Sequence, residues 1–286
     1  MGQKKKVMLQ DLSTKYEVSF LCKLFNFPRS SLYYQEQLRV RCSEHDQIVI
    51  DVFTKSRKIY GCRKIRATLL KRGYTLSRRK ILEIMRYHRL VPKYSLARKV
   101  RGNKSNKGSN WNSYTNLVLR QFNGRKPFEV IAADVTYVYF GKNRYYLCIF
   151  VDIATRMIVG TYVDIELGAN FVEKALMSMD LDLSKVEIFH TDRGAEFNNH
   201  QINQLMETFG VARSLSDVSA PLDNAVVESL NNIIKIEWKH GLQIRSIGEF
   251  RESWGEYVHW YNNERIHGSL KYKTPVEFLQ TLSNAS

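Results

Sequence analysis

Hydrophobic positions follow two different periods along the chain. Before residue 95 they recur at helical spacing, as at Ile48, Val49, Val52 and Phe53, which predicts a succession of helices. From residue 130 onward, short runs of β-branched and aromatic residues end at turn residues, which predicts strands. The expected strands cover 130–140, 145–153, 157–163, 186–190 and 211–215, and helices cover 169–179 and 199–209.

The order of these elements predicts the fold class. Three consecutive strands followed by alternating helix and strand are typical of an α/β domain with a mixed five-stranded sheet and flanking helices. The all-α region before it contains two helix–turn–helix patterns. We expect a helix–turn–helix DNA-binding region over 1–40, a second helical DNA-binding region over 41–94, a basic linker over 95–126, the α/β domain over 127–240, and a C-terminal helical extension packed on the core over 241–286.

Charge is distributed unevenly. Residues 1–126 hold 30 Lys and Arg against 7 Asp and Glu, whereas residues 127–286 hold 14 against 21. A segment this basic favours phosphate backbones through counterion release, although a merely solvated basic face is the alternative. The candidate DNA contacts on the helices of 62–88 are Arg63, Lys64, Arg66, Arg78, Arg79 and Lys80.

Cysteine spacing and the apolar runs exclude several classes of protein. The four cysteines form no CxxC pair and have no His at zinc-finger spacing, so we expect buried reduced thiols. The longest clean apolar run, over 145–151, is too short to cross a bilayer, and the basic N-terminus lacks the apolar stretch of a secretory signal. We expect a cytoplasmic protein with no membrane partner.

Three acidic residues occupy unusual positions. Asp134 interrupts the first strand, Asp192 follows the fourth, and Glu228 lies on an amphipathic helix that begins near Asn224. A carboxylate within a strand needs a partner, and a divalent metal ion is the usual one. If the two strands are neighbours, the three acids can hold two Mg²⁺ or Mn²⁺ ions, an arrangement suited to phosphoryl transfer on DNA.

The helix of Glu228 carries two further candidates. Asn224 lies one turn before Glu228 and Lys235 two turns after it, so one helix face would present an amide, an acid and a cation to a DNA strand. The alternatives are a helix N-cap for Asn224 and a solvated lysine for Lys235.

Three possible auxiliary residues also have two interpretations each. His190 either positions a phosphate or water, or is a core histidine with satisfied hydrogen bonds. Arg265 and His267 either contact DNA or pack against the core, and packing is the preferred interpretation.

Several motifs together resemble those of the DDE transposases of bacterial insertion sequences, the retroviral-integrase-like group. They are DVT at 134–136, HTDRG at 190–194, DNAVVES at 223–229 followed by Lys235, and YNNERIHGSLKYKTPVEF at 261–278. FPRSSLYY and YGCRKI match the DNA-binding region of that group. AEF at 195–197 departs from its more usual Gln-Tyr pattern, and APL at 220–222 departs from a more Gly-rich sequence.

The resemblance implies an RNase H-like fold with Asp134, Asp192 and Glu228 as catalytic residues that bind two Mg²⁺ or Mn²⁺ ions. It implies cleavage and joining of DNA strands at the element's terminal inverted repeats and at target DNA, by a nucleoid-associated homo-oligomer. Because many relatives are made as fusions, we expect this chain to be the downstream-frame part of a frameshifted protein, with an upstream-frame partner. Two alternatives stay open: an RNase H-like nuclease that only hydrolyses, and a catalytically inactive DNA-binding regulator.

Overall fold

The computed structural model describes residues 8–9, 11–33, 43–96, 114–168, 170–217 and 221–284. The chain divides into two compact units, Met1–Asp46 and Gln47–Ser286. In the first unit, α2 (Val18–Leu24) and α3 (Arg29–Tyr33) pack their apolar residues together around Leu21 and Leu32. The predicted basic tail over 1–6 lies outside the described residues.

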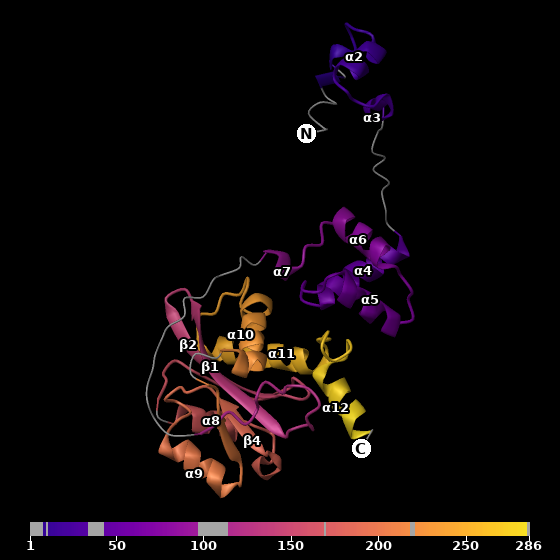
Figure 1. Cartoon of the computed structure of the whole chain (residues 1–286). Coiled ribbons are helices and arrows are strands. Elements are labelled where there is room, and N and C mark those ends of the chain that lie inside the picture. Colours follow the sequence, from indigo (N-terminus) through magenta and orange to yellow (C-terminus); the bar gives the residue numbers. More distant parts are fainter. Residues whose placement is uncertain are drawn as a thin grey trace. The chain divides into compact units, whose positions relative to one another are not determined.

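The second unit is built on the predicted mixed five-stranded sheet, which the structure confirms. The strand order is β3-β2-β1-β4-β5; β1, β2 and β3 form an antiparallel meander, and β4 and β5 continue parallel to β1 (Figure 1). The strands are β1 (Val130–Phe140), β2 (Asn143–Asp152), β3 (Ile158–Asp164), β4 (Ile188–Thr191) and β5 (Ala212–Leu215).

Side chains alternate between the two faces of β1, so the sheet separates two hydrophobic clusters. Ile131 and Ala133 belong to the cluster that includes α8 (Phe171–Met177) and α9 (His200–Thr208). Val130 and Ala132 face the other cluster, which contains α10 (Ala225–Glu237) and α11 (Ile247–Asn263). Figure 1 shows these two pairs of helices on opposite sides of the sheet.

The helices that precede the sheet share its second cluster. They are α4 (Glu44–Lys55), α5 (Cys62–Lys71), α6 (Arg78–Tyr87) and α7 (Lys93–Leu96). Ile65, Ile81 and other buried residues of α4, α5 and α6 belong to the same hydrophobic cluster as Trp260 of α11. The boundaries predicted at 94 and 126 therefore do not separate compact units, because buried residues of these helices and of α11 form one cluster within Gln47–Ser286.

The end of the predicted linker is also packed. Residues 97–113 lie outside the description, but Val118 is fully buried, and Leu117 donates its backbone N–H to Ser214 Oγ at 2.9 Å. Arg120 pairs with Asp223 at 2.6 Å. Residues 114–126, which composition alone assigns to a tether, therefore belong to the folded domain.

Helix boundaries follow the sequence signals closely. Ser77 caps α6 by accepting a hydrogen bond from the backbone N–H of Lys80, and α12 (Pro275–Ser283) starts with a capping box of Thr274 and Glu277.

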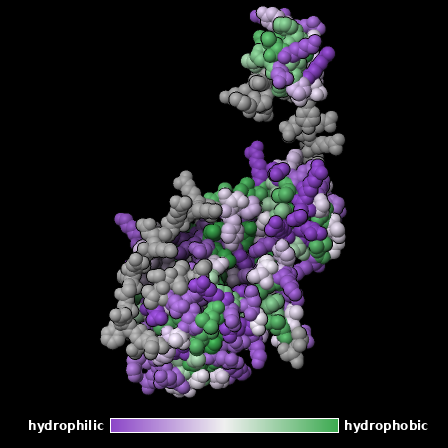
Figure 2. Space-filling view, in the orientation of Figure 1, coloured by the Kyte–Doolittle hydropathy of each residue, from purple (hydrophilic) through white to green (hydrophobic). Residues whose placement is uncertain are grey.

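Within the residues described, no helix is long and apolar enough to cross a membrane. Figure 2 shows a visible face on which apolar side chains form small, separate patches.

Three of the four cysteines are described. Cys22 and Cys148 are buried free thiols, and Cys62 is half-buried and free. The predicted burial agrees with Cys22 and Cys148 but not with Cys62, and Cys42 lies outside the described residues.

Candidate active site

The pairing of β1 with β4 brings two of the predicted acids together. The parallel ladder ends at the pair Ala133 and Thr191, so Asp134 and Asp192 are the next residues on neighbouring strands. Asp134 shares its face of β1 with Ala132, which faces the cluster that contains α10. Glu228 lies on that helix, so two strands and one helix contribute the three carboxylates.

The carboxylates lie close enough to perturb one another. Burial, together with the charges of Asp192, Glu196 and Glu228, raises the pKa of Asp134 to about 8. Burial also raises the pKa of Asp192, and burial followed by the charge of Asp192 raises the pKa of Glu228. The site therefore gathers acidic groups, and among the described residues no Lys or Arg forms an ion pair with Asp134, Asp192 or Glu228.

Glu196 is a fourth member of this group, and the sequence interpretation missed it. Its pKa is raised by burial and by Asp192. A Cβ atom on Gly194 would come within 2.6–2.7 Å of the Glu196 carboxylate, so the glycine leaves the space that this side chain occupies. The available signal was the departure from the family pattern at 195–197, which placed an extra acid beside Asp192.

Asn231 was also missed, and it contacts Asp134 directly. Its Nδ2 donates a hydrogen bond to Asp134 Oδ2, and the side chain is buried. Because Asn231 follows Glu228 by three residues on α10, it reaches β1 from the same side of the helix. Nothing in the sequence distinguishes it from the exposed Asn232 beside it.

The structure corrects the expectation for Asn224. Its side chain is buried and donates from Nδ2 to the backbone oxygen of Ala133 at 3.3 Å, so it does not present its amide to the surface. It stands at the N-cap position of α10 without making the side-chain capping bond. Its role in the fold is to tie the start of α10 to β1 beside Asp134, whereas Lys235 on the same helix is exposed.

The donor set suits a hard divalent cation. Four carboxylates are joined by two buried amide oxygens, Oδ1 of Asn224 and Oδ1 of Asn231, that have no hydrogen-bond partner. Oxygen acceptors thus outnumber donors, and such a group favours Mg²⁺ or Mn²⁺. Among the described residues, however, no three His, Cys, Asp or Glu side chains are gathered closely enough to hold an ion.

His190 supports this site from inside the fold. It is fully buried, its Nδ1 lies 2.8 Å from Ser214 Oγ, and its Nε2 lies 3.1 Å from the backbone oxygen of Asp223. Because Nε2 faces a carbonyl oxygen, this nitrogen carries the proton and donates there. Burial lowers the pKa of His190 to about 4, so the ring is neutral. The structure thus places His190 as the satisfied core histidine of the two alternatives.

Arg265 and His267 are buried too. Arg265 forms a two-pronged ion pair with Glu237, at 2.7 Å from Nε and 2.6 Å from Nη2. Its Nη1 lies within 3.1 Å of the His267 ring. This agrees with the preferred packing interpretation and leaves neither side chain facing solvent.

The basic residues of α5 and α6 divide into two groups. Arg63, Arg66, Arg78 and Arg79 are exposed, and Lys80 is half-buried. Lys64 lies over the Tyr60 ring at 5.0 Å, and burial lowers its pKa to about 7. Lys64 is therefore a weaker candidate for phosphate contact than its neighbours.

Three protein-family models match parts of the chain. A model described as "Integrase core domain" matches residues 124–221, and a second one of that description matches residues 209–275. A model described as "HTH-like domain" matches residues 43–98. The range matched by the first model includes Asp134 and Asp192, and the range matched by the second includes Glu228.

Individual proteins resemble the chain over most of its length. It is 25% identical over 278 residues to the putative transposase InsK for insertion sequence element IS150 of Escherichia coli, covering 95% of this chain and 96% of that protein. It is 29% identical over 232 residues to the putative transposase for IS986/IS6110 of Mycobacterium tuberculosis, covering 77% and 81%. Among solved structures, the HTLV-2 integrase catalytic core domain in complex with magnesium matches 54% of this chain and 98% of that chain, with a TM-score of 0.44 and 18% identity.

Proposed function

Because the chain belongs to the DDE transposases of bacterial insertion sequences, a family of DNA-acting enzymes with an RNase H-like integrase core, we propose that Asp134, Asp192 and Glu228 are its catalytic metal ligands. The single observation that carries this proposal is the mutual charge interaction of these acids where β1, β4 and α10 meet. Like charges that are brought together in this way, two of them half-buried, are unfavourable in a fold unless a ligand uses them.

Two Mg²⁺ or Mn²⁺ ions in this site would activate the attacking hydroxyl and stabilise the leaving oxygen during strand transfer. Asn231 holds Asp134 in position, and Gly194 donates its backbone N–H to Asp192 Oδ1 at 3.0 Å. Glu196, whose pKa is raised by burial and by the charge of Asp192, would add a fourth carboxylate to the residues that hold the ions.

Residues outside the acidic site would bind the DNA. We propose that the exposed basic residues Arg63, Arg66, Arg78 and Arg79 contact the phosphates of the terminal repeats. Exposed Lys235 lies on the same helix as Glu228 and would contact the strand at the acids. We further propose a homo-oligomer on DNA that acts at the nucleoid; the upstream-frame partner stays a prediction, because no comparison bears on it.

The test uses the full chain, Mg²⁺ and duplex DNA that carries the end of its own element. Wild type is expected to cleave this duplex and to join the 3′-hydroxyl end to target DNA, whereas Asp192→Asn loses at least about 10³-fold of both activities. DNA binding by the variant, measured without metal, is expected to stay at the wild-type level.

Two results would count against the proposal. Equal cleavage by wild type and Asp192→Asn would exclude these acids as the metal site. Hydrolysed ends without any joined product would instead identify a nuclease, the first of the two alternatives.

A further inference from the structure

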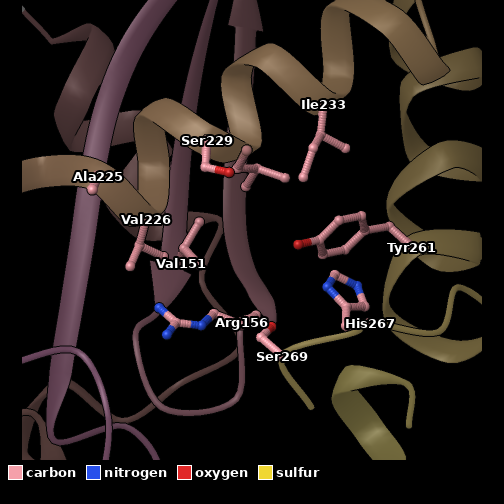
Figure 3. Close-up of a pocket in the computed structure, with 10 residues that line it drawn as sticks. Val151, Arg156, Ala225, Val226, Ser229, Ile233, Tyr261, His267 and Ser269 are labelled. Carbon is pink, nitrogen blue, oxygen red and sulfur yellow. The ribbon is translucent and has the colours of Figure 1, made fainter. Parts of the chain in front are cut away.

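A second candidate site lies against α10, the helix of Glu228, and shares none of the acids. It is a pocket of about 260 Å³ between α10, the turn that joins β2 to β3, and the segment that joins α11 to α12 (Figure 3). None of its lining residues is acidic. They are Val151, Arg156, Ala225, Val226, Ser229, Leu230, Ile233, Tyr261, His267 and Ser269.

Arg156 has one guanidinium nitrogen engaged and one without a partner. Nη2 donates to the backbone oxygen of Phe122 at 3.2 Å and to Asn123 Oδ1 at 3.4 Å. Nη1 is buried and makes no hydrogen bond. Burial lowers the pKa of Arg156 and the charge of Asp152 raises it, yet guanidinium stays charged in proteins. Among the described residues it forms no ion pair, so the pocket holds a cation with a free donor.

The position of Arg156 is fixed by its turn. The Asp152 carboxylate accepts hydrogen bonds from Thr155 Oγ1 at 2.6 Å, from Thr155 N at 3.1 Å and from Phe128 N at 3.1 Å. The backbone N–H of Arg156 then donates to Asp152 O at 2.9 Å. The side chain therefore starts from a rigid turn, which lowers the entropy cost of using it to bind a ligand.

The opposite wall adds neutral polar groups. Figure 3 shows Tyr261 directing its hydroxyl into the space under α10, with the His267 ring beside it. Burial, together with the charges of Arg265, Lys64 and Arg156, lowers the pKa of His267 to about 2, so this ring remains neutral. Ser229 and Ser269 are exposed and lie at the mouth of the pocket.

We propose that this pocket binds a phosphate group of a DNA strand, with Arg156 Nη1 as the charged donor and the hydroxyls of Ser229 and Ser269 at its rim. The proposal rests on the proposed function for its source of phosphate. Ser229 follows Glu228 on α10 and both side chains are exposed, so a strand whose reacting phosphate lies at the acids would cross the exposed side of the helix to reach the pocket. Since one water occupies about 30 Å³, the volume admits the phosphate with its sugar or with several waters.

Ethylation interference tests the pocket one phosphate at a time. Duplexes carrying the element's end are ethylated at random phosphates, bound by the full chain without divalent metal, and separated into bound and free fractions. For Arg156→Gln we expect interference to vanish at one or two adjacent phosphates and to persist at all others. Affinity should fall about 5- to 10-fold and the salt slope should decrease by about one.

Two further variants keep the test decisive. Arg144→Gln removes the same charge from an exposed position on β2 and should preserve the whole interference pattern. Ser269→Asp places a carboxylate at the exposed rim and should erase the same phosphates as Arg156→Gln, even if the latter folds poorly. Wild-type patterns and slopes in both pocket variants would overturn the proposal.

Inorganic phosphate separates the two sources of ligand. If phosphate shifts the Tyr261 and His267 resonances of the metal-free chain while the DNA pattern is unchanged in Arg156→Gln, the pocket takes a free anion and the DNA assignment is wrong. The interference experiment measures binding and not cleavage, so its result does not depend on the acids being catalytic. The Asp192→Asn experiment tests the acids alone.

Discussion

Helix α10 carries a glutamate near each end, and their surroundings are opposite. At the C-terminal end, Glu237 is buried with both oxygens bonded to Arg265, and Tyr257 Oη donates to it at 3.1 Å. Tyr94 Oη also donates to this carboxylate. Near the N-terminal end, Glu228 makes no hydrogen bond or ion pair among the described residues, and its nearest charged neighbours are other acids.

The contrast separates a charge that holds the fold from a charge that awaits a ligand. Glu237 joins α10 to α7 through Tyr94, to α11 through Tyr257 and to the segment after α11 through Arg265. Among the described residues Glu228 joins no other element, and removing its charge relieves repulsion. One helix therefore carries a glutamate whose charge is compensated within the fold and a glutamate whose charge is left for a ligand.

The largest expected effect is at the anchored end. Glu237→Gln leaves the Arg265 guanidinium buried without a counter-charge, and we expect a loss of about 3–5 kcal/mol in the free energy of unfolding, measured in urea. Glu228→Gln is the matched control and should lose nothing without metal. If both variants lose the same free energy of unfolding, the idea that only Glu237 compensates a buried charge is wrong.

Asn231→Ala probes the link between the helix and Asp134. Loss of the amide that holds the Asp134 carboxylate should weaken Mn²⁺ binding by about 10- to 100-fold, measured by titration calorimetry. Asn232→Ala, at the exposed neighbouring position, should bind Mn²⁺ as wild type does. Equal affinities in the two variants would show that Asp134 needs no positioning.

The smallest effect is a pH dependence of metal stabilisation. The pKa of Asp134 is raised from 3.8 to about 8, so the metal-free fold gains stability from protonation that is lost as pH rises toward 8. Metal binds the ionised form, so the rise in Tm caused by Mg²⁺ should grow from pH 6 to pH 8. This gain is at most about 1.4 kcal/mol per pH unit.

Glu196→Gln sharpens that measurement. Its negative charge helps to raise the pKa of Asp134, so its removal should move the pH profile of the Mg²⁺ effect to lower pH. Lys64, with a pKa of about 7, titrates in the same window. It affects the chain with and without Mg²⁺ alike, and the difference in Tm removes its contribution. A profile unchanged by Glu196→Gln would place that carboxylate outside the site.

Local periodicity was sufficient to predict the strands and helices, and the acids at 134, 192 and 228 were identifiable from their positions within them. Strand order was not predictable from periodicity, because any parallel neighbour of β1 would satisfy the same pattern. Asn224 was misassigned because helical spacing specifies a face but not which neighbour covers it. At the first turn of α10 that neighbour is β1.

The missed contacts join residues far apart in the chain. Two examples are the ion pair of Glu237 with Arg265 and that of Arg120 with Asp223, which lie 103 residues apart. From the sequence alone, each of these charged residues would be placed on the solvent-exposed surface. The same limit explains the domain boundaries. Apolar stripes on α4, α5 and α6 indicate burial, but they do not say whether the helices cover one another or a sheet.

The parallel pairing of β1 with β4 also sets an order of assembly. The meander β1-β2-β3 closes through neighbouring hairpins, whereas β4 must reach β1 across a long crossover that closes more slowly. We therefore expect Asp134 to remain in water early in folding and to meet Asp192 only when β4 docks. The repulsion is confined to the last steps, so a divalent ion should slow the unfolding rate far more than it speeds the folding rate.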